Sequence, residues 1–429
     1  IERHTVRAVN IATTAPFGPV HLNIPFREPL MIDFKDVLPK SSYIKSYTNE
    51  LAPSKQAIAE LTRILEQTTN GMIIIGELPL GTDTKHLWNF IREVKWPVMI
   101  ESLSNLRTEV PEDCQVYAIS TYDALMKNER FKQNVRPQTV IRFGAQPVSK
   151  FLMQFIVQAN PQSYIIIDED PMYRDSTHMS THFIHALPGE WVGEIELQHS
   201  LAEMEYVQFW KMADLLASDV IEKYSDYADD EGAMVQSLLA NIEEEADIFV
   251  SSSMPIRDID TFLLSTNQSI QIFANRGANG IDGVTSTALG FSNGRKMRKT
   301  YLLIGDLAFL HDANAFIASR YQQCDLTVIV MNNDGGGIFS YLPQSKVEAH
   351  YEDLFGTPTE LTFEQVASMY NMEYEKVKTK AELINTLATN KQASLKLIEV
   401  FTDREENVTQ HRLLWTRINE VIEQWLDSL

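Results

Sequence analysis

Two polar clusters in the last third of the chain contain side chains that could bind a cation and a phosphate. Gly305 and Asp306 directly follow an apolar run at residues 301–304, and residues 332–337, with the sequence Asn-Asn-Asp-Gly-Gly-Gly, follow another at 326–331. A carboxylate, an amide oxygen and a free carbonyl in a glycine turn are hard oxygen ligands, which suit Mg²⁺ held against phosphate groups. The predicted cation ligands are Asp306, Asn333 and the carbonyl of Gly335.

The two clusters can form one site only if the strands that precede them end at the same edge of a sheet. Continuous apolar runs are typical of buried parallel strands, and open α/β sheets bind ligands at the carboxyl edge of such strands. We expect a helix to begin just after Asp306 and to offer unpaired N–H groups to the same anion. Taken singly, each cluster has a structural explanation, because Gly-Asp is a common helix cap and Asn-Asn-Asp-Gly a good turn. Taken together, their spacing favours a metal and diphosphate site.

The composition describes a globular protein of more than one domain. The 429 residues include 44% hydrophobic and 22% charged residues, and the net charge is −21. This acidic balance argues against nucleic acid or an anionic membrane surface as a partner. Cys114 and Cys324 are the only cysteines, which favours a reducing cytoplasm. No apolar run approaches the length of a membrane span.

The pattern of the chain predicts an α/β protein with two complete parallel-sheet domains and the end of a third. Residues 53–195 alternate helical and strand patterns, with strands at 71–76, 97–101, 139–144 and 164–168, so we expect a Rossmann-like middle domain. Residues 203–429 form the second unit. Its expected strands are 247–251, 270–274, 299–304, 326–331 and 395–401, and its last helix is 412–429.

The first 52 residues cannot form a core of their own. Residues 1–30 predict a short helix and a strand at 20–24, which we interpret as the end of a further domain, and residues 31–52 read as a linker. Because the chain begins with Ile1 inside a helical pattern, we expect that a longer protein has lost its N-terminal part.

The two polar clusters resemble the signature of thiamine-diphosphate-dependent enzymes, which is Gly-Asp-Gly followed by Asn-Asn. The third position is Leu307 here, as is usual in the branch formed by the 2-succinyl-5-enolpyruvyl-6-hydroxy-3-cyclohexene-1-carboxylate (SEPHCHC) synthases. That branch commonly has Ser at the next position, but this chain has Ala308 and so lacks the hydroxyl. The resemblance implies a cofactor site made by Gly305, Asp306, Leu307, Ala308, Asn333, Gly335 and Gly336.

Two further segments are similar to those of the synthase family. Residues 275–283 read Asn-Arg-Gly-Ala-Asn-Gly-Ile-Asp-Gly, and so many glycines around one Arg suit a close approach of the backbone to a ligand. The resemblance implies that Ile281 supports the cofactor from below and that Arg276 pairs with a substrate carboxylate. Ser253 and Arg257 match a Ser-x-x-x-Arg element, which makes Arg257 a second carboxylate binder, although a helix cap and a solvated arginine are the ordinary interpretation.

The resemblance also implies a substrate pocket. Ile338, Phe339 and Leu342 would cover the active site and exclude water. Lys150 would contribute to substrate binding, but an exposed helix lysine explains this position equally well.

The function implied by the resemblance is that of a thiamine-diphosphate-dependent transferase in menaquinone biosynthesis. It would decarboxylate 2-oxoglutarate and join the remaining unit to isochorismate, with Mg²⁺ or Mn²⁺ holding the cofactor. The family also implies a homodimer or homotetramer whose active site is shared between subunits. Its catalytic Glu comes from the first domain, so we expect the chain as printed to be inactive alone.

Two alternatives remain open at this stage. An acetolactate synthase or another 2-oxoacid decarboxylase would keep Asp306 and Asn333 but has no need for the segment around Arg276. A non-catalytic regulatory module could bind a nucleotide in the middle domain. That domain has Gly-Glu-Leu-Pro-Leu-Gly at 76–81 after its first strand, where a dinucleotide site would have Gly-x-Gly-x-x-Gly.

Overall fold

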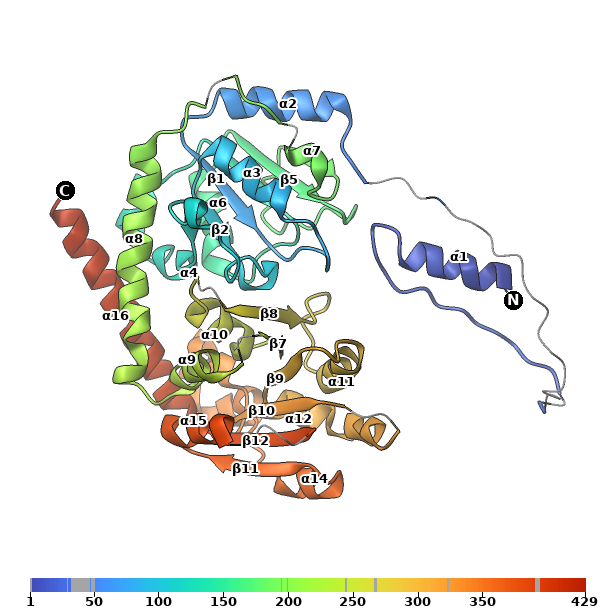
Figure 1. The fold of residues 1–429 in the computed structure, drawn as a ribbon. Coiled ribbons are helices and arrows are strands. Elements are labelled where there is room, and N and C mark those ends of the chain that lie inside the picture. Colours follow the sequence, from blue (N-terminus) through green and yellow to red (C-terminus); the bar gives the residue numbers. More distant parts are fainter. Residues whose placement is uncertain are drawn as a thin grey trace.

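The chain folds into two parallel sheets that lie one beyond the other (Figure 1). The structure is a computed structural model and describes residues 2–28, 30–31, 47, 51–193, 195–198, 200–243, 245–265, 268–321, 324–389 and 394–429. The predicted linker at 31–52 lies largely outside the described residues. Every strand pairing in the described ranges is parallel, which confirms the predicted α/β class.

The first sheet has six strands in the order β3-β2-β1-β4-β5-β6. These strands are β1 (Gly71–Ile75), β2 (Val98–Ile100), β3 (Ala118–Ile119), β4 (Thr139–Phe143), β5 (Ser163–Asp168) and β6 (His182–His185). The helices around them are α2 (Lys55–Glu66), α3 (Lys85–Val94), α4 (Tyr122–Leu125), α5 (Glu129–Asn134), α6 (Lys150–Ala159) and α7 (Glu190–Gly193). All residues of β1 and β4 are buried, because helices cover both faces of the sheet.

The second sheet has the order β11-β12-β10-β9-β7-β8. Its strands are β7 (Glu245–Val250), β8 (Ser269–Ala274), β9 (Lys299–Gly305), β10 (Leu326–Asn332), β11 (Glu373–Val377) and β12 (Leu395–Phe401). Its helices include α9 (Glu231–Asn241), α10 (Met254–Phe262), α11 (Val284–Gly294), α12 (Asp306–His311), α13 (Glu348–Tyr351), α14 (Glu364–Met369) and α15 (Lys380–Thr389). The 3₁₀ turn η5 (Gly337–Tyr341) follows β10.

Two long helices, α8 (Met204–Glu222) and α16 (Arg404–Asp427), pack side by side along the outside of the molecule (Figure 1). Helix α16 begins earlier than the predicted residue 412, because the Asp403 carboxylate caps it by accepting from the N–H groups of Glu405 and Glu406. Its buried face comprises Asn407, Val408, His411, Leu414, Ile418, Ile422 and Leu426. Leu413 lies outside this face and is 38% exposed.

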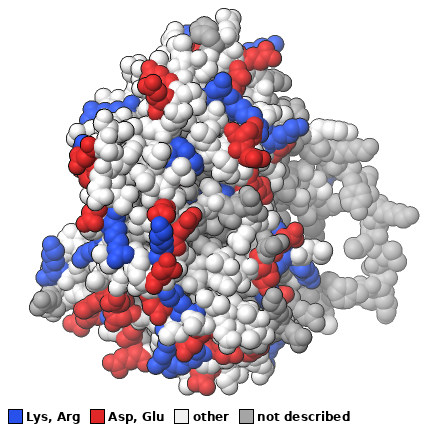
Figure 2. Space-filling view, turned by 60° about the vertical axis from the view of Figure 1, so that its left-hand side comes forward, with Lys and Arg blue, Asp and Glu red and all other residues white. Residues whose placement is uncertain are grey.

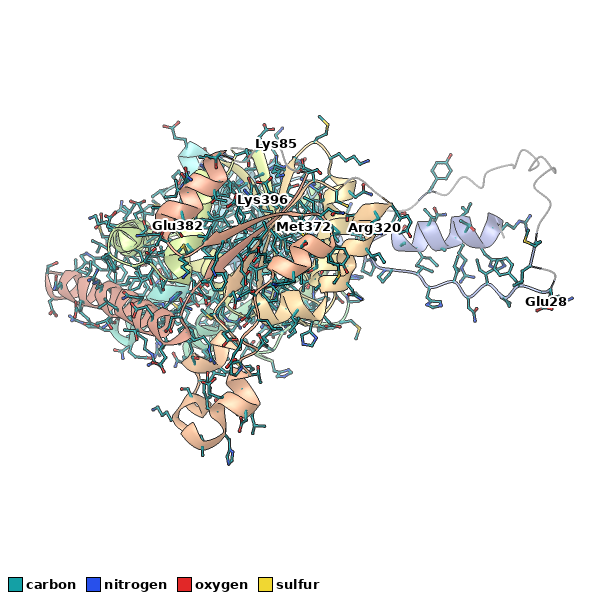
Figure 3. The ribbon with its side chains drawn as sticks, turned by 90° about the horizontal axis from the view of Figure 1, so that it is seen from below. Glu28, Lys85, Arg320, Met372, Glu382 and Lys396 are labelled. Carbon is teal, nitrogen blue, oxygen red and sulfur yellow. The ribbon has the colours of Figure 1, made fainter. Side chains whose placement is uncertain are left out.

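The predicted strand at residues 20–24 is wrong. After α1 (Glu2–Ala12), residues 17–27 have no regular secondary structure, and the side chains of Val20, Leu22 and Ile24 are exposed. A strand is stable only when a neighbour pairs with its backbone, and none of the described strands pairs with this segment. Seen from below in Figure 3, Glu28 lies at the far end of this segment, away from both sheets.

Two short helices lie between β3 and β4. Helix α4 ends at Leu125 and α5 begins at Glu129, because the Asn128 side chain accepts from the Phe131 N–H group and starts a new helix. Strands β3, β6 and β11 were not predicted. All three are edge strands.

Charged side chains of both signs lie on the described surface. On the face drawn in Figure 2, basic and acidic side chains are interspersed, so the described positive residues there form no continuous band. Among the helices of the described ranges, none combines the length and the apolar character needed to cross a membrane.

Candidate functional site

The two polar clusters lie side by side at the carboxyl edge of the second sheet. Strands β9 and β10 pair in parallel, with Met331 opposite Gly305. Asp306 begins α12 directly after β9, and its side chain is 3% exposed. Its Oδ2 accepts a hydrogen bond of 2.8 Å from the Gly335 N–H group in the turn after β10. The two turns are therefore bonded to each other.

Asn333 offers one unused oxygen in this turn. Its Nδ2 donates to Oε1 of Glu231 at 2.5 Å, whereas its Oδ1 is buried and has no hydrogen-bond partner among the described groups. A buried oxygen without a hydrogen-bond partner destabilises the fold unless an ion or another ligand binds to it.

Two glycines make the turn possible. Gly335 has φ of 140°, and a Cβ atom there would lie 2.0 Å from the Gly356 carbonyl oxygen. A Cβ on Gly336 would lie 2.3 Å from the carbonyl oxygen of Phe355. The Gly336 N–H group donates a hydrogen bond of 2.7 Å to the carbonyl oxygen of Gly356. A larger residue at either glycine would push the turn away from the segment that holds it.

These groups fit a cation that bridges to a diphosphate. Asp306 has a carboxylate, Asn333 an amide oxygen and Gly335 a backbone carbonyl, which is not free as expected, because it accepts from the Gly337 N–H group at 3.0 Å. Such hard oxygens are the donors that Mg²⁺ and Mn²⁺ prefer. Burial raises the pKa of Asp306 to about 6, although the N–H groups of Gly335 and Leu307 oppose this shift. A bound cation would favour the charged carboxylate and offset the cost of its burial.

A cavity of about 360 Å³ opens directly onto this edge. It brings together most of the residues that the sequence indicated, which are Ser253, Arg257, Arg276, Ile281, Gly305, Asp306, Leu307, Ala308, Asn333, Gly335, Gly336, Ile338 and Phe339.

Two arginines bring positive charge to the same cavity. Arg257 lies on α10, and Arg276 lies in the loop after β8. Loss of hydration and the neighbouring Arg276 lower the pKa of Arg257, but its guanidinium stays charged because an arginine side chain normally titrates far above neutral pH. Neither arginine forms an ion pair with a described carboxylate within 4.0 Å. The cavity is therefore suited to anionic groups.

Two predicted residues do not line the cavity. Lys150 begins α6, where Ser149 caps the helix, and its side chain is exposed. Leu342 ends the turn η5 and is 37% exposed. Both roles stay predictions.

Glu231 was missed by the sequence reasoning. It lines the cavity, is 1% exposed, and bonds to Asn333 from a position 102 residues away in the sequence. Burial raises its pKa to about 7. The only local signal is Asp-Glu-Gly at the start of a helix, which indicates a cap and nothing about the cavity.

Comparisons with known proteins agree with this architecture. Residues 41–250 match a family model described as the middle domain of thiamine pyrophosphate, and residues 263–400 match the C-terminal TPP-binding domain of thiamine pyrophosphate enzymes. An X-ray structure from Mycobacterium smegmatis, described as a thiamin diphosphate-dependent enzyme, aligns with a TM-score of 0.61 over 94% of this chain and 73% of its own, at 15% identity. The fold and the cavity thus define a thiamine-diphosphate-dependent enzyme.

Relatives with known names identify one family within the thiamine-diphosphate-dependent enzymes. The SEPHCHC synthase of Lysinibacillus sphaericus is 61% identical over 98% of this chain and 73% of its own length. The synthases of Bacillus velezensis and Listeria welshimeri are 36% and 34% identical, over 98% and 97% of this chain and 73% and 72% of their own lengths. The chain belongs to the SEPHCHC synthase family, whose members are thiamine-diphosphate-dependent transferases of menaquinone biosynthesis.

Proposed function

We propose that this chain uses thiamine diphosphate to join decarboxylated 2-oxoglutarate to isochorismate, forming SEPHCHC. The observation that carries the proposal is the combination, in one cavity, of the Asp306 and Asn333 oxygens with the guanidinium groups of Arg257 and Arg276. Both proposed substrates are dianions, so an otherwise acidic protein needs positive charge at this point.

Mg²⁺, or Mn²⁺ in its place, would be held by Asp306, Asn333 and the Gly335 carbonyl together with the diphosphate oxygens. When bound, thiamine diphosphate supplies the carbon nucleophile that decarboxylation and transfer require. Ile281 lines the same cavity and would support the cofactor.

The protein residues bind and orient the substrates. The planar guanidinium groups of Arg257 and Arg276 can each hold a carboxylate through two parallel hydrogen bonds. Ile338 and Phe339 line the cavity beside the glycine turn and would keep water from the reacting carbon. Ser253 precedes α10, and its backbone carbonyl accepts from Nη1 of Arg257 at 2.5 Å, which orients that side chain.

The remaining predictions belong to the same proposal. The Glu that activates the cofactor would come from a neighbouring subunit of a homodimer or homotetramer. A reducing cytoplasm as the place of action is supported by the low number of cysteines, because Cys114 and Cys324 are the only two in the sequence.

Titration calorimetry with thiamine diphosphate tests the proposal. At fixed Mg²⁺, Asp306→Asn should weaken cofactor binding by more than about 100-fold, because loss of a direct ligand exceeds the 10- to 100-fold effect of an outer contact. Asp325→Asn is the control, because Asp325 is exposed and pairs with Lys299 on the surface. Unchanged affinity in Asp306→Asn would contradict the proposed cation site.

A further inference from the structure

We infer that Glu231 is a positioning residue that turns the Asn333 amide so that its oxygen, and not its nitrogen, faces the cation. This inference rests on the proposed function, because it takes Asn333 Oδ1 as a cation ligand. Glu231 itself would not touch the cation; it acts through the hydrogen bond from Asn333 Nδ2 to its Oε1.

The orientation of this amide matters because its two ends differ chemically. The carbonyl oxygen of an Asn side chain can ligate a cation, whereas its NH₂ group can only donate hydrogen bonds. A rotation of 180° would therefore remove one of three protein ligands. Something beside Asn333 must distinguish the two orientations.

Glu231 can make this distinction. The hydroxyl of Thr402 donates to the same Oε1 atom at 3.0 Å, so this oxygen acts as an acceptor. The group of Asn333 that faces it must therefore be the donor, Nδ2. Since Glu231 is 1% exposed, water does not compete for this contact.

Glu231 is held in place by the start of α9. Its neighbour Asp230 caps this helix by accepting from the Ala233 N–H group at 3.0 Å, and it also accepts from the Tyr224 hydroxyl at 2.6 Å. His411 contacts Asp230 from α16 at 3.0 Å. The backbone of Glu231 is therefore held in place, which restricts where its carboxylate can lie.

The adjacent Asn332 shows what an ordinary structural amide looks like in the same turn. Its Nδ2 donates to Glu399 Oε1 at 2.6 Å and to the Leu361 carbonyl at 3.1 Å, and its Oδ1 accepts from the Asp334 N–H group at 3.2 Å. Both ends of Asn332 are used. Asn333 also gives its nitrogen to a buried Glu, but its oxygen is left for a ligand.

The test measures the Mg²⁺ concentration that gives half-maximal binding of thiamine diphosphate, by titration calorimetry. Glu231→Leu removes the acceptor, and this concentration should rise about 10- to 100-fold, the effect expected when an outer-shell partner is lost. Glu231→Gln keeps an acceptor oxygen and should stay within about threefold of the unmodified protein.

Thermal unfolding without cofactor shows whether Glu231→Leu is folded. If Glu231→Leu does not fold, the inference can be tested by exchanging the donor and the acceptor between residues 333 and 231. Asn333→Asp alone places two carboxylates together and should raise the Mg²⁺ requirement. Adding Glu231→Gln restores a donor and acceptor pair and should lower the Mg²⁺ requirement again. A double variant that needs as much Mg²⁺ as Asn333→Asp alone would overturn the inference.

Failure of this inference differs from failure of the proposed function. If Asp306→Asn abolishes the Mg²⁺ dependence but a folded Glu231→Leu keeps it unchanged, only the role of Glu231 is wrong. If Asp306→Asn itself keeps the Mg²⁺ dependence of the unmodified protein, the cation site is wrong, and the role of Glu231 is wrong with it.

Discussion

Arg107 and Asp260 form a buried ion pair across the junction of the two sheets, with Nη2 2.5 Å from Oδ1 although 153 residues separate them. Arg107 lies in the loop that follows β2, and its Nη1 also donates to the carbonyl oxygens of Asp260 and Leu263, at 2.6 and 2.8 Å. Asp260 is on α10, the helix that carries Arg257. One guanidinium thus holds the helix of a proposed substrate-binding residue against the first sheet.

We expect Arg107→Ala to lower the free energy of unfolding by about 3–5 kcal/mol, because it leaves a buried carboxylate and the backbone carbonyls of Ile100, Asp260 and Leu263 without their partner. Denaturant unfolding measures this change. The matched control is Arg92→Ala, which removes a surface pair with Asp113 at 2.6 Å and should cost at most about 1 kcal/mol. Equal losses in both variants would contradict the role of the buried pair.

Gly335→Ala should abolish tight binding of thiamine diphosphate while the sheets stay folded. The added Cβ would meet the Gly356 carbonyl oxygen at 2.0 Å, so the turn between Asp306 and Asn333 must move. Calorimetry measures the affinity, and circular dichroism checks the fold. Gly290→Ala is the control, because this glycine lies in α11 with nothing within 4 Å of the added atom. It should stabilise the chain by about 0.5–1 kcal/mol.

The buried His411 should make stability depend on pH. Burial opposes its charge, but hydrogen bonds and attraction from Asp230 and Asp258 outweigh this and raise the pKa of His411 to about 10 from an ordinary 6.5. A raised pKa means that the stabilisation is complete below pH 6.5 and is lost as pH rises towards 10. Burial raises the pKa of Asp258, which offsets part of this gain.

The free energy of unfolding of His411→Gln, measured from pH 6 to pH 10, tests this dependence. The variant should be less stable than the unmodified protein at pH 6, by at most about 5 kcal/mol, and the difference should shrink steadily towards pH 10. His182→Gln, at a position on the edge strand β6 where the side chain is 37% exposed, is the matched control. A difference for His411→Gln that does not change with pH would refute the charged state.

Arg276→Lys should weaken binding of 2-oxoglutarate to the protein loaded with cofactor and Mg²⁺. Lys keeps the charge but loses the planar fork, so about tenfold in affinity should be lost. Calorimetry with 2-oxoglutarate and with pyruvate, which has one carboxylate fewer, measures whether the loss is greater for the dianion. Arg63→Lys, on the exposed face of α2, is the control. An equal loss for both ligands would argue against carboxylate pairing by Arg276.

Sequence patterns located the central strands well because those strands are buried on both faces. The runs at 301–304 and 326–331, which lie within β9 and β10, contain almost only apolar residues, which leaves little ambiguity. Edge strands lack this signal. Strand β11 reads Glu-Tyr-Glu-Lys-Val and β6 reads His-Phe-Ile-His, since one side of each faces solvent, and both were missed. Residues 20–24 show the opposite error, since an apolar segment without a pairing neighbour forms no strand.

The sequence by itself determined the parallel α/β class and the neighbouring positions of Asp306 and Asn333, because apolar runs ending in polar turns dictate where parallel strands stop. Through the likeness of its motifs, it also indicated the family. Only the tertiary structure decided that Glu231 bonds to Asn333, that Lys150 stays outside the cavity, and that Arg107 joins the two sheets. Contacts between residues a hundred or more positions apart depend on how helices pack against sheets, and no local pattern records them.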